Sequence, residues 1–289
     1  MQENKLEMKD FVPNLLRRTE IPCMRLKLVD TTPGIAESKF GGRGYVPHDA
    51  AIPTNSDGVQ MRLLAQIDCK QITIPDFPTS GLLQFWAIND DLTGCNFDNN
   101  TEQKDFRICY YETVDPTVTE EEVAAKEGNN LPDEEDLFPI EGCFGLEFEQ
   151  TTDRMSRCDY RFWGKMEELM RECYPEQAKQ LFADEDAKEA FEEELEEYLD
   201  ERDELGETPD WMPDAFGHKI GGYPGFSQED PRDIAAEDDH DVLLLQIDTD
   251  EAGEREIMWG DSGVANFFIS REHLKQRNFQ DVIYTWDCY

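Results

Sequence analysis

Positive charge is scarce in this 289-residue sequence, which has 27 lysines and arginines against 66 aspartates and glutamates and a formal net charge of −39. Proteins that bind DNA, RNA or an anionic membrane surface present basic residues to their partner, so this balance argues against those classes. Hydrophobic residues make up 38% of the chain and aromatic residues 11%, which is enough for a core. The sequence therefore predicts a folded acidic protein that binds neither nucleic acid nor membranes.

Long apolar runs are also absent. No stretch approaches the roughly 18 apolar residues that span a bilayer, and residues 1–11 lack the apolar segment of a signal peptide. We therefore expect a cytoplasmic protein whose eight cysteines are reduced thiols. No two cysteines have the C-x-x-C spacing of a zinc or redox site, and only four histidines could assist them. We expect no metal site and no cofactor.

The sequence repeats itself at a long interval. Four blocks recur in the same order, and the members of each pair are 175 to 182 positions apart. The pairs are residues 39–42 with 219–222, 63–68 with 243–248, 80–86 with 262–268, and 107–112 with 282–287, the last at an offset of 175. Each block is short, rich in aliphatic and aromatic residues and bounded by turn formers, which is typical of strands. The sequence predicts an α+β, β-rich fold that is internally duplicated into two similar β-sheet halves.

Individual blocks predict how their strands are buried. Alternation over residues 63–69 places Leu63, Ala65 and Ile67 on one apolar face. Residues 82–88 are apolar on nearly both faces, which indicates a central strand covered on both sides, one of them by the other half. A first strand for each half is expected at residues 21–29 and at residues 140–148.

The second half contains an additional helical segment. Apolar residues recur at helical spacing from Phe162 to Tyr174, Pro175 can open a second helix, and a third apolar stripe runs from Ala187 to Leu205. The expected domains are a first β-rich unit with a short N-terminal helix, an acidic linker, and a second β-rich unit with a helical insert. Their bounds are residues 1–115, 116–139 and 140–289, with the insert at about 159–210.

The acidic residues concentrate in two segments. Residues 115–139 hold nine acids and one base, and residues 184–210 hold fifteen acids and two bases, which together is more than half of the net charge. One interpretation is a solvated face that keeps the protein in solution. The other is a docking surface for a basic protein partner. The sequence does not distinguish the two.

Several long motifs carry a resemblance to a known family. FGGRGYVP at residues 40–47, HKIGGYPGFSQEDPR at 218–232, IMWGDSGVANFFI at 257–269 and VIYTWDC at 282–288 resemble the YwqG-like family of bacterial proteins, whose defining domain has no known function. The resemblance extends from about residue 20 to the end of the sequence. It implies a β-rich α+β fold of two similar halves and supplies no catalytic residue, cofactor or substrate. It also implies an association with toxins and their immunity proteins, because genes of the family often lie beside theirs.

Features present in both halves are expected to serve the fold. The glycine pairs at 41–42 and 221–222 fit turns with positive φ rather than a phosphate loop, because G-x-x-x-x-G-K-[ST] is absent. Gln246 and Asp248 repeat Gln66 and Asp68. These polar residues at strand ends either bond to loop backbone or line a groove between the halves.

Features present in one half only are better candidates for function. Arg232 closes the QEDPR segment, and Trp259, Asp261 and Ser262 belong to WGDS. An arginine can donate two hydrogen bonds to one carboxylate, and an indole can form the wall of a pocket beside polar groups. Together they would suit a ligand pocket with an aromatic wall. The alternative is a loop whose arginine pairs with its own acids. Ser262 lacks the G-x-S-x-G context of a hydrolase nucleophile, so we assign no catalytic residue.

The sequence thus favours a non-enzymatic cytoplasmic interaction module with a basic protein as its partner. The alternative is a small polar ligand-binding protein or an enzyme with a cleft between the two halves. The candidate ligand-binding residues for that cleft are Arg232, Gln246, Asp248, Trp259, Asp261 and Ser262. The identity of any ligand and the oligomeric state stay open.

Overall fold

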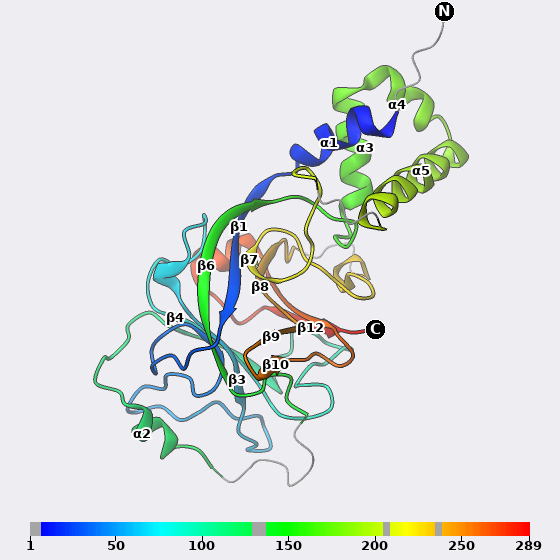
Figure 1. Cartoon of the computed structure of the whole chain (residues 1–289). Coiled ribbons are helices and arrows are strands. Elements are labelled where there is room, and N and C mark those ends of the chain that lie inside the picture. Colours follow the sequence, from blue (N-terminus) through cyan, green and yellow to red (C-terminus); the bar gives the residue numbers. More distant parts are fainter. Residues whose placement is uncertain (1–6, 129–136, 205–208, 235–238) are drawn as a thin grey trace, which may run out of the picture.

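A computed structural model of the chain describes residues 7–128, 137–204, 209–234 and 239–289 (Figure 1). It is a β-rich α+β fold in which a curled antiparallel sheet lies beside a group of helices. Leu205, the last residue of the predicted helical stripe, and residues 129–136 of the predicted linker lie outside the described residues. The fold class expected from the sequence is confirmed at this level.

Ten of the described strands form one sheet in the order β12-β11-β8-β7-β1-β6-β2-β3-β4-β5. Their bounds are β1 (Ile21–Val29), β2 (Lys39–Gly41), β3 (Arg62–Asp68), β4 (Leu82–Ala87), β5 (Phe106–Tyr111), β6 (Cys143–Asp153), β7 (His218–Gly221), β8 (Val242–Asp248), β11 (Val264–Ile269) and β12 (Ile283–Asp287). A separate hairpin consists of β9 (Asp250–Ala252) and β10 (Arg255–Ile257).

The two long strands β1 and β6 form the centre of the sheet. They pair antiparallel from Ile21 opposite Asp153 to Val29 opposite Gly145, while β1 also pairs with β7 and β6 with β2. The first strand has the bounds expected from the sequence. The second begins at Cys143 rather than at residue 140, because Gly142 adopts a positive φ of 81° that interrupts an extended strand.

The main core lies between the two ends of the curled sheet. Every residue of β4 and of β11 is buried, and the rings of Phe85 and Phe267 lie 4.7 Å apart across the core. The expectation of a strand covered on both sides is confirmed. The predicted alternation in β3 is wrong at one point. A bulge between Leu63 and Ala65 places Leu64, rather than Leu63, in the cluster that contains Ala65.

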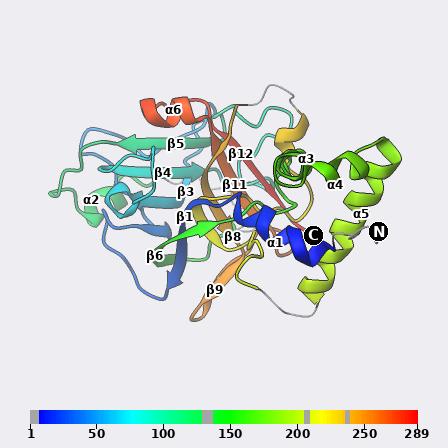
Figure 2. The same ribbon diagram turned by 90° about the horizontal axis from the view of Figure 1, so that it is seen from above.

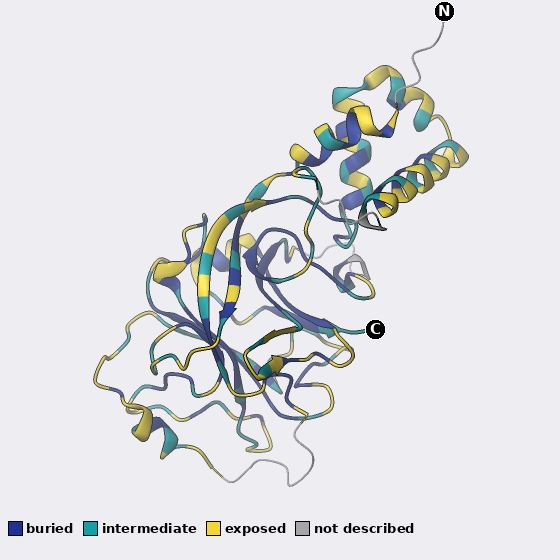
Figure 3. Cartoon of the chain, viewed as in Figure 1, coloured by how far each residue is buried: buried dark blue, intermediate teal, exposed yellow. Residues whose placement is uncertain are grey.

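The helices form a second, smaller core at one end of the sheet (Figures 1 and 3). They are α1 (Met8–Arg17), α3 (Phe162–Cys173), α4 (Pro175–Leu181) and α5 (Glu185–Glu204). Phe11 and Leu15 of α1 belong to one buried cluster with Met166 of α3 and Leu195 of α5. The three helical runs expected from the sequence are confirmed, including Pro175 in the first turn of α4.

The remaining described elements are short. They are α2 (Glu120–Ala124), α6 (Arg271–Gln276) and the 3₁₀ turns η1 (Cys69–Gln71) and η2 (Pro231–Ile234). Figure 2 labels two of them, α2 and α6. Thr119 caps α2 by accepting a hydrogen bond from the backbone N–H of Glu122. Among the described helices, none combines the length and the apolar character needed to cross a membrane.

Candidate functional site

Arg232 is buried where η2 meets the sheet. Its guanidinium donates to the Asp230 carboxylate at 2.9 Å from Nε and 2.7 Å from Nη2, and to Asp159 at 3.3 Å. The guanidinium carbon also lies 4.0 Å from the centroid of the Phe268 ring. Burial raises the pKa of Asp159, but Arg161 and Arg232 lower it more, so it lies below its ordinary value. Arg232 therefore holds its own loop against the sheet through neighbouring acids.

Gln246 is fully buried on β8 and cross-links two loops. Its Oε1 accepts a hydrogen bond from the backbone N–H of Gly225 at 2.8 Å, and its Nε2 donates to the carbonyls of Ala215 and Gly217 at 2.9 and 2.8 Å. Gln66 on β3 makes the corresponding bonds to Tyr45, Ile35 and Glu37, at 2.7, 2.9 and 2.8 Å. Both glutamines bond to loop backbone, as the first of the two interpretations expected.

Asp248 organises the turn after β8. Its Oδ2 accepts from the backbone N–H of Gly217 at 2.6 Å and its Oδ1 from that of Thr249 at 2.8 Å. Its own N–H donates to Nδ1 of His218 at 2.9 Å. Burial raises the pKa of the Asp248 carboxyl, and the hydrogen bond from Gly217 opposes the rise. The residue is half-buried and directed toward backbone.

Trp259 is buried in the main core, whereas Asp261 and Ser262 lie in an exposed turn. The centroids of the Trp259 and Trp286 rings lie 6.0 Å apart. The backbone carbonyl of Trp259 accepts a hydrogen bond from the backbone N–H of Gly263 at 2.7 Å. Ser262 has a positive φ of 59°. Within the described residues, no hydrogen bond or ion pair joins the side chains of any two of the six predicted site residues. Their role in ligand binding stays a prediction.

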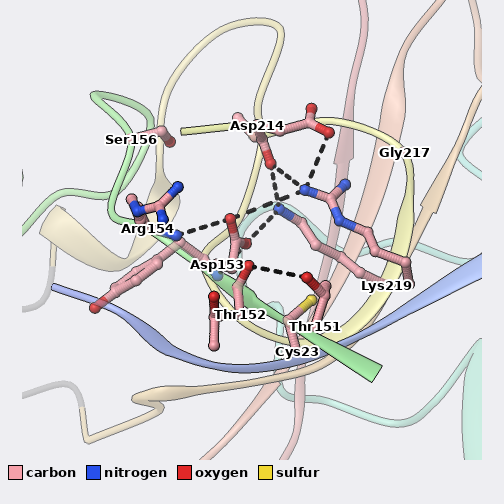
Figure 4. Close-up of polar contacts among 12 residues, drawn as sticks. Cys23, Thr151, Thr152, Asp153, Arg154, Ser156, Asp214, Gly217 and Lys219 are labelled. Atoms are coloured by element: carbon pink, nitrogen blue, oxygen red, sulfur yellow. Dashed lines mark hydrogen bonds and ion pairs between the residues drawn. The ribbon is translucent and has the colours of Figure 1, made fainter. Parts of the chain in front are cut away.

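A buried ion pair that the sequence analysis did not identify joins Asp153, the last residue of β6, to Lys219 of β7, with β1 between these two strands in the sheet (Figure 4). Lys219 is 0% exposed, and its Nζ donates to Oδ2 of Asp153 at 2.9 Å and to the carbonyl of Asp214 at 3.1 Å. Arg25 lies 3.9 Å from the other Asp153 oxygen and 3.2 Å from the Asp214 carboxylate. Burial lowers the pKa of Lys219, and the Asp153 carboxylate opposes that change.

Lys39 occupies a similar buried position on β2 but has a different set of partners. Its Nζ donates to the carbonyls of Gly34, Arg43 and Pro33 at 2.6, 3.2 and 3.4 Å. Burial lowers the pKa of this lysine. A lysine inside both glycine-pair blocks was the sequence feature that could have identified these two buried cations.

Burial also affects the pKa of the cysteine thiols. It raises the pKa of Cys23 and Cys109 to about 11 and that of Cys69 and Cys95 to about 12. These thiols are protonated at neutral pH and are therefore weak nucleophiles. All eight cysteines are free. In the part of the chain that the structure describes, no group of three or more His, Cys, Asp or Glu side chains is arranged to hold a metal ion.

Two cavities of about 640 and 530 Å³ border the first half of the sheet. At the larger one, Arg43 donates to Glu120 at 2.8 Å and to Glu127 at 2.6 Å. Gln60 donates to the carbonyl of Lys126 at 2.9 Å. These contacts hold α2 and the residues after it against the loops that follow β2 and precede β3, so these polar side chains are already bonded within the protein.

A smaller pocket of about 320 Å³ lies beside the QEDPR loop. Its lining consists of Leu92, Phe97, Gln228, Glu229, Asp230, Pro231, Thr285, Trp286, Asp287 and Cys288. The aromatic wall therefore comes from Phe97 and Trp286 rather than from Trp259. Sequence reasoning placed an aromatic wall near this loop but missed both rings, because they belong to a distant loop and to the last strand.

A groove of about 370 Å³ separates α1 from α5. Its lining consists of Glu7, Met8, Lys9, Glu194, Glu197, Tyr198, Glu201 and Arg202. The three α5 glutamates in this lining are exposed. This groove belongs to the acidic segment that the sequence analysis singled out.

The fold and these sites together define a β-rich α+β protein with buried polar cross-links, an aromatic pocket and an acidic helical face. Residues 38–288 match the family described as a domain of unknown function (DUF1963). The chain belongs to this family. No curated protein matches it. The expectation of a domain without a known function is confirmed, whereas the YwqG-like name and a bacterial origin stay predictions.

Proposed function

We propose that this protein is a non-enzymatic binding module whose acidic helical end docks a basic protein partner. The observation that carries the proposal is the outward face of α5. Phe191, Leu195 and Leu199 of this helix are buried in the helical core. The exposed acids of the same helix are Glu185, Asp186, Glu189, Glu193, Glu194, Glu196, Glu197, Asp200 and Glu201.

Few of these acids have a basic neighbour. Arg157 lies 3.6 Å from Glu196 and 2.7 Å from Asp200. Within the described residues, no ion pair involves Glu193, Glu194 or Glu197. Like charges at a spacing of four residues destabilise a helix by a few tenths of a kcal/mol per pair, and a basic partner would offset that repulsion. The uncompensated field would also steer a basic protein toward this end of the molecule.

The groove between α1 and α5 gives this surface a shape. Glu194, Glu197 and Glu201 line one side, spaced by three and four residues so that they share a face of the helix. Tyr198 lies between them and stacks on Trp211 with ring centroids 6.2 Å apart. Arg202 of the same helix already lies over this ring, with its guanidinium carbon 4.9 Å from the ring centroid. A partner's lysine or arginine side chain can therefore lie along the groove with its charge at the carboxylates rather than on the ring.

We also propose that the sheet arose by duplication of one unit, with α3 to α5 as an acidic insertion in the second copy. The strand order supports it, because β5-β4-β3-β2-β6 from one edge corresponds to β12-β11-β8-β7-β1 from the other. Leu64 and Leu244, which are 180 residues apart, are both skipped by the strand pairing. The final strands correspond at an offset of 176 rather than 175, since Phe85 faces Ile108 and Phe267 faces Tyr284.

We propose a cytoplasmic location as well. Eight free cysteines suit a reducing compartment. The YwqG-like resemblance suggests a basic toxin as one partner of suitable chemistry. In that case this chain would act as the immunity protein that neutralises the toxin.

The test is capture of partners from a cell lysate on the immobilised full chain at low and at moderate salt. We expect a basic protein that is retained at low salt and released as salt is raised, because exposed charge pairs are screened over roughly 10 Å at 0.1 M. The triple variant Glu194→Gln, Glu197→Gln, Glu201→Gln should lose that protein.

A matched control removes the same charge elsewhere. Glu147 and Glu149 on β6 and Glu254 in the β9–β10 hairpin are exposed, so the triple substitution of these acids by Gln alters net charge equally. It should retain the partner. Equal loss in both triple variants, or capture that salt does not affect, contradicts docking at α5.

A further inference from the structure

The pocket beside the QEDPR loop contains an unusually open aromatic pair. Phe97 is 57% exposed and its ring lies 6.4 Å from that of Trp286 at an angle of 55°. Nε1 of Trp286 donates to the carbonyl of Leu92 at 2.8 Å, which fixes the indole orientation. Two aromatic side chains thus border a space of about 320 Å³, at the small end of the range for ligand pockets.

A comparable pair, between edge strand β5 and the segment that leads into β12, is closed. Tyr110 of β5 lies 5.5 Å from Phe279 at an angle of 51°, and Phe279 is only 4% exposed. Arg277 is close to this pair, and its guanidinium forms an ion pair with Glu112. Burial raises the pKa of Tyr110, and the positive charge of Arg277 opposes this rise. A cation and a carboxylate therefore accompany the closed aromatic pair.

The open pair has carboxylates but no cation in its lining. Asp287 accepts hydrogen bonds from the backbone N–H groups of Ser227 and Gln228 at 3.1 and 2.7 Å, which holds its carboxylate at the pocket wall. Glu229 is exposed and, within the described residues, takes part in no ion pair. The lining includes no lysine or arginine. Aromatic faces attract cations, and nearby carboxylates add to that attraction.

We propose that this pocket binds a small organic cation, a quaternary ammonium group held against the neighbouring rings of Phe97 and Trp286 and neutralised by Glu229 and Asp287. A neutral ligand of the same shape would gain contact with the rings but would lack the attraction to their faces and to the acids. The site shares no residue with the groove between α1 and α5. This proposal can therefore be tested independently of docking at α5.

The test is calorimetric titration of the full chain with choline and with 3,3-dimethylbutan-1-ol, in which carbon replaces the charged nitrogen, at constant ionic strength. We expect saturable choline binding and at least about fivefold weaker binding of the alcohol, the ratio that about 1 kcal/mol of cation–π attraction gives. Phe97→Ala should weaken choline binding by a similar factor. Glu229→Gln should weaken it about threefold.

The controls separate this site from general effects. Phe216 is an exposed aromatic residue outside the pocket, so Phe216→Ala should leave choline affinity unchanged. Nα-acetyl-lysine methylamide serves as a probe for a protein side chain. The proposal is overturned by absence of saturable choline binding, by equal affinity for the neutral alcohol, by unchanged affinity in Phe97→Ala, or by tighter binding of the lysine derivative, which would make the occupant a partner's side chain.

Discussion

Removing the carboxylate beside Lys219 tests how strongly the buried ion pair stabilises the fold. In Asp153→Asn the side chain keeps its shape, but the ammonium of Lys219, which is 0% exposed, loses the only carboxylate among the described residues within 4 Å of it. Stranding one member of a buried ion pair costs about 3–5 kcal/mol. Because small domains are stable by about 5–15 kcal/mol, this is about a fifth or more of the total.

The magnitude should depend on pH in a defined direction. Burial already lowers the pKa of Lys219, and loss of Asp153 lowers it further. A lysine whose folded pKa is depressed destabilises the fold fully below that pKa, and the penalty disappears as pH rises toward the ordinary value of 10.5. The deficit of Asp153→Asn relative to wild type should therefore shrink with rising pH, which a loss of packing alone would not produce.

The assay is urea denaturation at several pH values, with the free energy of unfolding taken by linear extrapolation. Asp214→Asn is the matched control, since that carboxylate is 76% exposed, lies 3.2 Å from Arg25 and should contribute less than about 1 kcal/mol. Lys219→Met added to Asp153→Asn should restore stability. A deficit below about 1 kcal/mol, one independent of pH, or a double variant as unstable as Asp153→Asn would refute the reasoning.

Two further predictions concern the other buried polar groups. Lys39→Met should destabilise the protein, because three loop carbonyls lose their donor, and the deficit should grow as pH approaches 10.5, because the penalty for charging this buried lysine then disappears in wild type; a pH-independent difference in urea midpoint contradicts this. Gln246→Leu and Gln66→Leu should each destabilise by about 3 kcal/mol or more, because three backbone groups lose their partner; the exposed Gln276→Leu is the control, and effects as small as its own would contradict the assigned role.

Local patterns predicted most of the secondary structure. Alternation and helical spacing identified β4, β11 and the three helices of the acidic segment, because burial of one face or both leaves a direct mark on composition. The bulge at Leu64 was not predictable, since nothing in a run of consecutive leucines indicates which one the pairing skips. The start of β6 at Cys143 depends on the φ of Gly142, which the residue type permits but does not require.

The candidate site was harder to predict, for a physical reason. Arg232 and Gln246 were identified as polar residues in unusual places, but their partners are set by tertiary packing, and those partners are loop backbone and neighbouring acids. Phe97 and Trp286 carried no local mark, because a single aromatic residue in a loop or a last strand is ordinary. Only the chain's path brings these two rings together.

Lys219 pairs with a carboxylate, that of Asp153, whereas Lys39 bonds, among the described residues, only to backbone carbonyls, and the positions of the two lysines in the fold explain this difference. Lys39 donates to the carbonyls of Pro33, Gly34 and Arg43, all within six residues of it in the sequence, so the local chain itself keeps those acceptors together. Lys219 instead bridges Asp153 and Asp214, between which the chain runs through α3, α4 and α5. Asp153 and Asp214 are therefore far apart in the sequence, and the local chain does not keep them close together. The charged pair supplies that constraint, and it thereby fixes the base of the helical end whose acidic face we propose as the docking surface.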